Sequence, residues 1–198
     1  RLAVSNMAIE AGGKAGIWPC DDLTREYIGN DVRGEYTPVE ADEDAVYCSV
    51  LEYDLSELEP FVSYPHLPSN GRPVKDADVR IDQAYLGSCT NGRIEDMRIG
   101  AEIVRGRHVA PGVRMIVVPA SQRVMRQMAD EGLIDVFLEA GAFVSGPTCG
   151  ACLGGYMGIL APDEVAVAST NRNFIGRMGA KDSYVYPVSY THLTLPTI

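Results

Sequence analysis

The chain has 198 residues, 46% of them hydrophobic, which suits one large or two small globular domains. Its 27 Asp and Glu residues outnumber its 17 Lys and Arg residues, and the net charge of -10 argues against a nucleic-acid partner. The sequence has no run of about 20 apolar residues that could span a membrane, and it has no secretory leader. We therefore expect a cytoplasmic protein with no membrane partner.

Residues 1–58 are expected to form the last part of an α/β domain. The chain opens with Arg-Leu-Ala-Val instead of Met, which indicates a truncated start. Ser5 suits the N-cap of a short helix, and the glycines from Gly12 onward suit its end. Asp21 places negative charge at the start of a second helix over residues 23–28, where the helix dipole favours it.

The middle of the chain contains three segments of different character. Residues 30–44 are polar and acidic, which predicts a solvated loop. Residues 45–53 are rich in Val, Tyr and Leu, which predicts a strand. Residues 59–78 contain four prolines and an Asn-Gly pair, and we interpret them as a linker between two domains.

Strands and helices alternate from residue 79 to residue 188. We expect strands over 81–86, 114–119, 142–145 and 165–169, and helices over 93–106, 121–131 and 134–140. This alternation predicts a three-layer α/β/α domain with a mostly parallel sheet, in which ligands bind beyond the carboxyl ends of the strands. The last ten residues, 189–198, carry no charged Lys, Arg, Asp or Glu and are interpreted as a non-native tail.

Three cysteines stand out because each follows a predicted strand in a loop of small residues. Cys89 lies in Gly-Ser-Cys-Thr-Asn-Gly, and Cys149 and Cys152 lie in Gly-Pro-Thr-Cys-Gly-Ala-Cys-Leu-Gly-Gly. Small residues let backbone amides approach cluster sulfides, and two intervening residues let both thiolates reach one metal centre. A helix that starts just after Cys89 would favour its thiolate form. The odd total of five cysteines argues against a secreted disulfide framework.

The cysteine pattern by itself leaves an iron-sulfur cluster, a zinc site and a redox thiol pair open with comparable weight. A redox pair usually opens a helix near the start of its domain, whereas this Cys-x-x-Cys pair lies late in the chain. A zinc site would need a fourth ligand. Cys20, Cys48, His66 and His108 have no ligand-like spacing.

Polar residues in two other segments could bind a substrate. Asn171, Arg172 and Arg177 follow a predicted strand, and arginines suit bidentate binding of carboxylates. The alternative is that these arginines pair with surface acids. Asn6 and Glu10, four residues apart, would share one face of a helix and could point into a cleft, although such a pair is more often solvated.

Taken together, the motifs resemble the aconitase superfamily of hydro-lyases. The resemblance covers residues 1 to about 187, and its motifs fall in the order that the family has. They are Ser-Asn-Met-Ala-Ile-Glu-Ala-Gly (5–12), Leu-Gly-Ser-Cys-Thr-Asn-Gly-Arg (86–93), the Cys-x-x-Cys loop (146–155) and Asn-Arg-Asn-Phe-Ile-Gly-Arg (171–177). Residues 53–60 and the following Pro-His resemble the compact branch of 3-isopropylmalate dehydratases, homoaconitases and 2,3-dimethylmalate dehydratases.

The resemblance implies a cofactor and its ligands. Cys89, Cys149 and Cys152 would be the three protein ligands of a 4Fe-4S cluster, which leaves one iron without a thiolate. That open iron would act as a Lewis acid on the substrate hydroxyl and a neighbouring carboxylate.

The resemblance also implies roles for the polar residues. Arg172 and Arg177 would bind substrate carboxylates, and Asn171 would lie beside them near the cluster. Asn6 and Glu10 would be catalytic groups near the cluster, where Glu10 would hydrogen-bond the iron-bound hydroxyl or water.

Other parts of the family's active site have no counterpart in this chain. The family's Asp-His and Asp-Ser-His groups lie in an N-terminal portion, and its serine base lies in a small subunit or swivelling domain. The expected function is therefore that of a large-subunit fragment that is inactive alone. With its small-subunit partner it would isomerise 2-isopropylmalate and 3-isopropylmalate in leucine biosynthesis, or act on another small di- or tricarboxylic hydroxy-acid as a homoaconitase or 2,3-dimethylmalate dehydratase does.

Overall fold

The structure is a computed structural model that describes residues 1–29 and 34–188. The chain divides into two compact units, Arg1–Leu58 and Glu59–Ile198. The segment that we interpreted as a non-native tail, 189–198, lies outside the described residues, as does part of the acidic loop. Within the described part of the chain, every helix is too short or too polar to cross a membrane.

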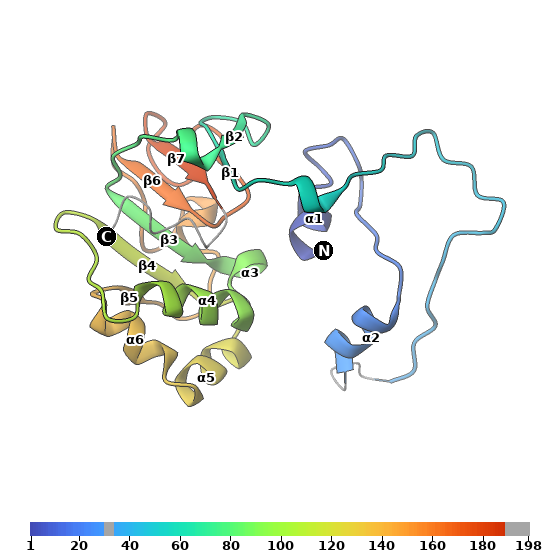
Figure 1. Cartoon of the computed structure of the whole chain (residues 1–198), viewed down its shortest axis with the longest axis horizontal. Helices are drawn as coiled ribbons and strands as arrows, with labels where there is room; N and C mark the ends of the chain where they lie inside the picture. Colours follow the sequence, from blue (N-terminus) through green and yellow to red (C-terminus); the bar gives the residue numbers. More distant parts are fainter. Residues whose placement is uncertain (30–33, 189–198) are drawn as a thin grey trace. The chain divides into compact units, whose positions relative to one another are not determined.

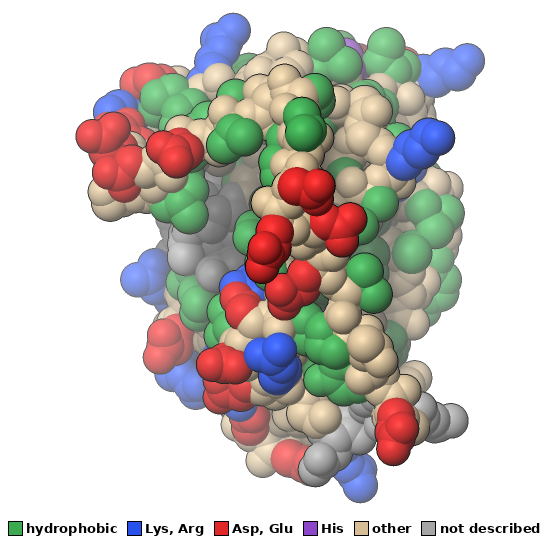
Figure 2. Space-filling view, turned by 90° about the vertical axis from the view of Figure 1, so that its right-hand side faces the viewer, with side chains coloured by type: hydrophobic (Ala, Val, Ile, Leu, Met, Phe, Trp, Pro, Cys, Tyr) green, Lys and Arg blue, Asp and Glu red, His purple; other side chains and the backbone are tan. Residues whose placement is uncertain are grey.

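The first unit consists of short helices joined by extended chain. These are α1 (Leu2–Asn6), α2 (Asp22–Ile28) and the 3-10 helix η2 (Leu55–Glu57). None of its described residues is buried, and Ile17 and Val46 are 87% and 95% exposed. Figure 2 shows hydrophobic and acidic side chains together on the molecular surface. The strand predicted over 45–53 is wrong: those residues form irregular chain, and no described strand pairs with them.

Helix α1 is shorter than predicted and starts earlier. Ser5 lies inside α1 instead of capping it. After Asn6 the chain continues as single turns, in which the N–H of Glu10 donates to the carbonyl of Met7 at 3.1 Å. Asn6 and Glu10 therefore lie on a helix end and the following turn, and not on one face of a single helix. The nearby Gly12, with φ of +81°, takes a conformation that side chains disfavour and that prevents further helix.

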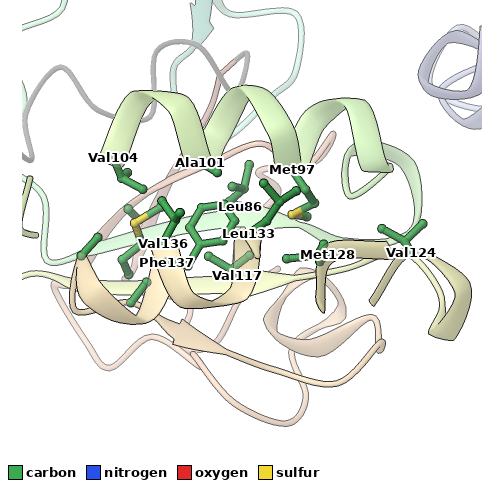
Figure 3. Packing of buried hydrophobic residues seen from close by; sticks show 14 of the residues in the cluster. Leu86, Met97, Ala101, Val104, Val117, Val124, Met128, Leu133, Val136 and Phe137 are labelled. Carbon is green, nitrogen blue, oxygen red and sulfur yellow. The ribbon is translucent and has the colours of Figure 1, made fainter. Parts of the chain in front are cut away.

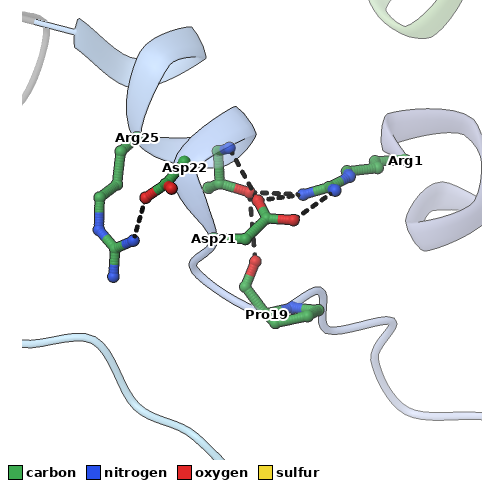
Figure 4. Close-up of polar contacts among 6 residues, drawn as sticks. Arg1, Pro19, Asp21, Asp22 and Arg25 are labelled. Carbon is green, nitrogen blue, oxygen red and sulfur yellow. Dashed lines mark hydrogen bonds and ion pairs between the residues drawn. The ribbon is translucent and has the colours of Figure 1, made fainter.

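Helix α2 begins as predicted, with Asp21 as its N-cap (Figure 4). The Asp21 carboxylate accepts the N–H of Thr24 at 2.9 Å and two hydrogen bonds from the Arg1 guanidinium at 2.7 and 2.6 Å. The bonds from Arg1, followed by the bond from Thr24, lower the pKa of Asp21 well below its usual range. This cap joins the first residue of the chain to α2 within the first unit.

The segment that we interpreted as a linker contains an antiparallel hairpin. Strands β1 (Phe61–Ser63) and β2 (Gly71–Pro73) pair with each other, and the 3-10 helix η3 (Val74–Asp76) follows. Val62 is 3% exposed and forms an antiparallel bridge with Val188. The rings of Tyr64 and Tyr186 meet edge to face, with 5.2 Å between their centroids. The hairpin is therefore part of the second unit and packs beside β7.

The second unit is built on a five-stranded parallel sheet (Figure 1). The strand order is β5-β4-β3-β6-β7, and the predicted α/β class is confirmed. The strands are β3 (Gln83–Gly87), β4 (Arg114–Val118), β5 (Phe143–Val144), β6 (Val165–Ala168) and β7 (Tyr184–Pro187). The α-helices are α3 (Ser88–Asn91), α4 (Ile94–Val104), α5 (Gln122–Asp130) and α6 (Leu133–Glu139). The predicted strands and helices of this unit agree to within a few residues at each end, whereas β7 was not predicted.

Helices α4, α5 and α6 pack on one face of the sheet (Figure 3). Side chains alternate between the two faces of a strand, so Leu86 of β3 and Val117 of β4 both point to this face. They meet Met97 of α4, Met128 of α5 and Phe137 of α6, all of which are fully buried. This cluster is the main hydrophobic core.

Irregular chain covers the opposite face of the sheet. Tyr85 and Ile116 point to this side and pack with Ala151 of the 3-10 helix η4 (Gly150–Leu153) and with Met178. In the described part of the second unit, loops and η4 cover this face in place of the helices that the predicted third layer would have. A Cβ at Gly179 would lie 2.3 Å from the carbonyl oxygen of Leu160, a backbone approach too close for a side chain at that position.

The strand order creates a topological switch point between β3 and β6. From β3 the chain moves outward to β4 and β5, and it then crosses back to β6 on the other side of β3. Strands β3 and β6 are paired in parallel, with Tyr85 opposite Ala168. Loops that leave two such strands diverge at their carboxyl ends and form a crevice there, where α/β sheets bind ligands.

Candidate functional site

Cys89 is held at this switch point by the tight end of β3. Gly87 has φ of +119°, and a Cβ there would lie 2.0 Å from the carbonyl oxygen of Val118. Ser88 also has a positive φ, of 69°, and is buried. The chain then forms the single helical turn α3, on which Cys89 is exposed. Only glycine fits the first of these positions, so the Gly-Ser-Cys sequence determines where the thiol emerges.

Cys149 and Cys152 lie at the start of η4 and inside it. The N–H of Cys152 donates to the carbonyl of Cys149 at 3.2 Å, which closes the turn between them. The hydroxyl of Thr148 accepts the N–H of Gly150 at 3.1 Å. Cys149 is exposed and Cys152 is half-buried. Both thiols therefore remain accessible, while the backbone between them is fixed by local hydrogen bonds.

The three thiols lie close to one another although they come from two loops. Cys149 is near enough to both Cys89 and Cys152 for these two thiols to shift its pKa. Burial raises the pKa of the Cys149 thiol, Cys89 and Cys152 raise it further, and the nearby positive charge of Arg177 opposes them. Cys149 is thus close enough to interact electrostatically with both other thiols and with one arginine of the predicted substrate loop.

Tyr85 lies beneath the Cys-x-x-Cys turn and was not predicted as part of the site. Its hydroxyl donates to the carbonyl of Cys149 at 3.2 Å. Burial raises the pKa of Tyr85 above its ordinary value, with further contributions from Cys152, Cys149 and Cys89. The sequence gives no sign of this contact, because the hydroxyl bonds to a backbone atom far along the chain.

The loop after β6 lies against the loop that carries Cys89. The hydroxyl of Ser169 accepts the N–H of Gly87 at 2.8 Å. The side-chain amide of Asn91 donates to the carbonyl of Ser169 and, at 3.0 Å, to the side-chain oxygen of Asn171. These contacts bring Asn171 beside the cysteine loop. Ser169 and Asn91 were not predicted, although both lie next to predicted site residues.

The two predicted arginines follow Asn171 in the same loop. Arg172 and Arg177 are half-buried. The Nε of Arg177 is shielded from solvent and has no hydrogen-bond partner among the described residues. Asn6 and Glu10 are also half-buried, and they belong to the first unit. The other predicted site residues all lie in the second unit.

The donor set in the second unit fits an iron-sulfur cluster in its chemistry. Three thiols lie near one another on loops of small residues, the ligand type that such clusters use. Within residues 1–29 and 34–188, no group of three or more His, Cys, Asp or Glu side chains surrounds one point closely enough to hold a metal ion. The three thiols are near one another but do not surround one point that closely, so the loops would have to move for a metal centre to bind. Buried hydroxyls of Ser88 and Thr170, beside the site, also lack partners in the described chain.

Comparison with known proteins gives consistent results. The sequence profile of the Aconitase family (aconitate hydratase) matches residues 1–193. The chain is 55% identical over 187 residues to the 3-isopropylmalate dehydratase large subunit of Halothermothrix orenii, covering 94% of this chain and 44% of that protein. It is 57% identical over 187 residues to the protein of the same name from Lachnoclostridium phytofermentans, with the same coverage.

A third relative, from Acetivibrio thermocellus, has the same name and is 53% identical over 190 residues, which cover 96% of this chain and 45% of that protein. The chain thus spans less than half the length of the curated relatives that it matches. Because the family profile matches almost every residue, including all the cysteine and arginine motifs, the chain belongs to the aconitase family.

Proposed function

We propose that this chain is part of the large subunit of a hydro-lyase that interconverts 2-isopropylmalate and 3-isopropylmalate by dehydration and rehydration in leucine biosynthesis. The main support is that three thiols lie near one another beside an arginine loop at the switch point of the sheet. Relatives more than half identical to this chain are named 3-isopropylmalate dehydratase large subunits.

Cys89, Cys149 and Cys152 would hold a 4Fe-4S cluster through their thiolates. When bound, the cluster supplies a Lewis acid that makes a substrate hydroxyl a better leaving group. Cys149 must lose its proton for this, and binding of a metal centre offsets the burial that raises its pKa. Metal uptake should therefore release protons.

Asn171, Arg172 and Arg177 would bind the substrate. A guanidinium can form two parallel hydrogen bonds with a carboxylate, and the buried, unpartnered Nε of Arg177 has such a bond available. The amide of Asn91 holds the side chain of Asn171 beside the cysteine loop, at 3.0 Å. These residues would orient a di- or tricarboxylic hydroxy-acid toward the thiols.

Asn6 and Glu10 would act as catalytic groups near the cluster, where Glu10 would hydrogen-bond the leaving hydroxyl or water. A separate base is required to take a proton from the adjacent carbon. We propose that the base comes from a small-subunit partner that carries a swivelling domain. The chain alone should therefore be inactive. The cytoplasmic location expected from the sequence stays a prediction.

Anaerobic reconstitution of the chain with iron and sulfide tests the cluster. The parent chain should gain the absorbance and electron paramagnetic resonance signals of a cluster with one labile iron. Cys89→Ser should lose them, whereas Cys48→Ser, which changes an exposed cysteine outside the site, should not. A redox pair would need only Cys149 and Cys152, and a zinc site would take zinc instead. A normal cluster in Cys89→Ser would refute the ligand assignment.

The substrate is tested with the full-length large subunit and its small subunit. Turnover of isopropylmalate, homocitrate and dimethylmalate should be compared, and isopropylmalate should be preferred. Arg172→Lys should raise KM strongly because lysine cannot form a paired hydrogen bond with a carboxylate. Arg126→Lys, on the exposed surface of α5, should leave KM unchanged. Preference for homocitrate or dimethylmalate would instead indicate a homoaconitase or a 2,3-dimethylmalate dehydratase.

A further inference from the structure

The Cys-x-x-Cys turn is attached to the sheet at few points. Its own hydrogen bonds join neighbouring residues, such as the N–H of Gly154 to the carbonyl of Ala151 at 2.8 Å. These bonds give the turn its shape but do not fix its position over the sheet. Ala151, which is fully buried, provides an apolar contact with the core beneath. An apolar contact is non-directional, so it does not by itself set where the two thiols lie.

Tyr85 supplies a directional contact to the start of the turn. Its side chain rises from the central strand β3 and is fully buried. The hydroxyl donates to the carbonyl of Cys149, at 3.2 Å, and the N–H of Cys152 donates to that same carbonyl. Gly150 follows Cys149, and a Cβ there would be 2.6 Å from the hydroxyl oxygen. The turn thus lies directly on the phenol oxygen, with no side chain between them.

The packing of the core does not explain the hydroxyl. Tyr85 is surrounded by apolar residues such as Ile116 and Leu160. A phenylalanine would fill nearly the same volume there, and a buried hydroxyl without a hydrogen bond would cost free energy. The hydroxyl is accommodated because it bonds to the backbone of the turn.

We propose that Tyr85 is a positioning residue that sets the place of Cys149 and Cys152 relative to Cys89. Tyr85 and Cys89 belong to the same strand and the turn that follows it, so the hydroxyl connects the loop of one thiol to the loop of the other two. As a role toward a cluster, this inference rests on the proposed function. Tyr85 would place the thiols in the metal-free chain as well, so this part of the inference can be tested without a cluster.

The test compares Tyr85→Phe with Tyr186→Phe, which removes a hydroxyl from β7 in the same sheet. In the metal-free chain, Cys149 and Cys152 should react with a thiol reagent several-fold faster in Tyr85→Phe, as measured by mass spectrometry of each peptide. In the reconstituted chain, Tyr85→Phe should release iron to a chelator several-fold faster and show a shifted paramagnetic resonance spectrum. Tyr186→Phe should match the parent in all three measurements.

A second variant keeps the test decisive if the first affects folding. Gly150→Ala should disturb the same thiols, because the new methyl group meets the hydroxyl oxygen. Removal of that oxygen should relieve the clash, so Tyr85→Phe combined with Gly150→Ala should be less disturbed than the sum of the single variants. Strictly additive effects, or a Tyr85→Phe chain identical to the parent, would overturn the inference.

Failure of the proposed function would give a different experimental result from failure of the Tyr85 inference. If the proposed function is wrong, the parent chain will take up no cluster, or Cys89→Ser will assemble a normal one. The reactivity of the metal-free thiols would still report on Tyr85.

Discussion

The thiol of Cys149 lies close to that of Cys89 across two loops that follow different strands, and Cys89 contributes to the raised pKa of Cys149. Mild oxidation of the metal-free chain with diamide should therefore form a disulfide between them, as each thiol gives its hydrogen to the reagent. Peptide mapping by mass spectrometry should find this pair. Disulfides formed only between Cys149 and Cys152 would contradict the contact with Cys89.

Gly87→Ala should destabilise the chain and displace Cys89. The new methyl group would meet the carbonyl oxygen of Val118 at 2.0 Å, and φ of +119° is strained for alanine. We expect a loss of about 1–3 kcal/mol in the free energy of unfolding, measured with urea. Gly146→Ala is a suitable control in the other cysteine loop, because a Cβ there has no neighbour within 4 Å. Equal stability of the two variants would contradict the packing at the end of β3.

Glu164→Gln should lower stability at neutral pH and much less in acid. The Arg114 guanidinium forms two hydrogen bonds with the Glu164 carboxylate, at 2.7 and 2.8 Å, and lowers its pKa. A carboxylate with a lowered pKa in the folded state contributes stability above its unfolded value of 4.5, and that contribution disappears as pH falls through the folded value. We expect a cost of about 0.5–1 kcal/mol at pH 7 for this partly exposed pair.

Urea unfolding of the parent and of Glu164→Gln at pH 7 and at pH 3 gives this comparison. Asp130→Asn is the control, because its ion pair with Arg126 is exposed and long, at 3.9 Å. A difference between parent and Glu164→Gln that stays constant with pH would show that the charge is not responsible.

Asn173→Ala should loosen the hairpin of β1 and β2 from the arginine loop. The Asn173 side chain is fully buried, and its amide donates to the carbonyl of Tyr64 at 2.9 Å. Removal of the amide leaves that carbonyl without this donor, at a cost of about 1–3 kcal/mol. Hydrogen exchange should rise in 61–73. Asn70→Ala removes an exposed amide from the hairpin itself and should have little effect, so similar exchange in both variants would contradict this role.

Much of the second unit was predictable from the sequence, because each of its strands and helices can be recognised from its own residues. Each strand is a short apolar run, and each helix has its own apolar face, so alternation of the two indicates a parallel sheet. Cys89 and Asn171 were identified as site residues because each follows a strand, and strands β3 and β6 end side by side. Their proximity follows from parallel pairing alone.

The features that were missed depend on distant partners. The β-prone residues of 45–53 have no neighbouring strand in the described chain, so propensity alone does not make a strand of them. The proline-rich segment 59–78 was interpreted as a linker because the bridge between Val62 and Val188 joins residues far apart in the sequence. Tyr85 was missed for the same reason, since its hydroxyl bonds a carbonyl 64 residues away.

The parallel sheet also determines where this protein can tolerate change. The loops that carry the predicted cysteines and substrate arginines of the second unit leave the carboxyl ends of strands, whereas the turns that enter β4 and β5 lie at the opposite edge. At that edge Gly112 and Gly141 have open space around them. Insertions, tags or fluorescent labels should be accepted there without disturbing the chemistry. An insertion of one residue between Tyr85 and Leu86 would instead turn Leu86 away from the main core and displace Cys89.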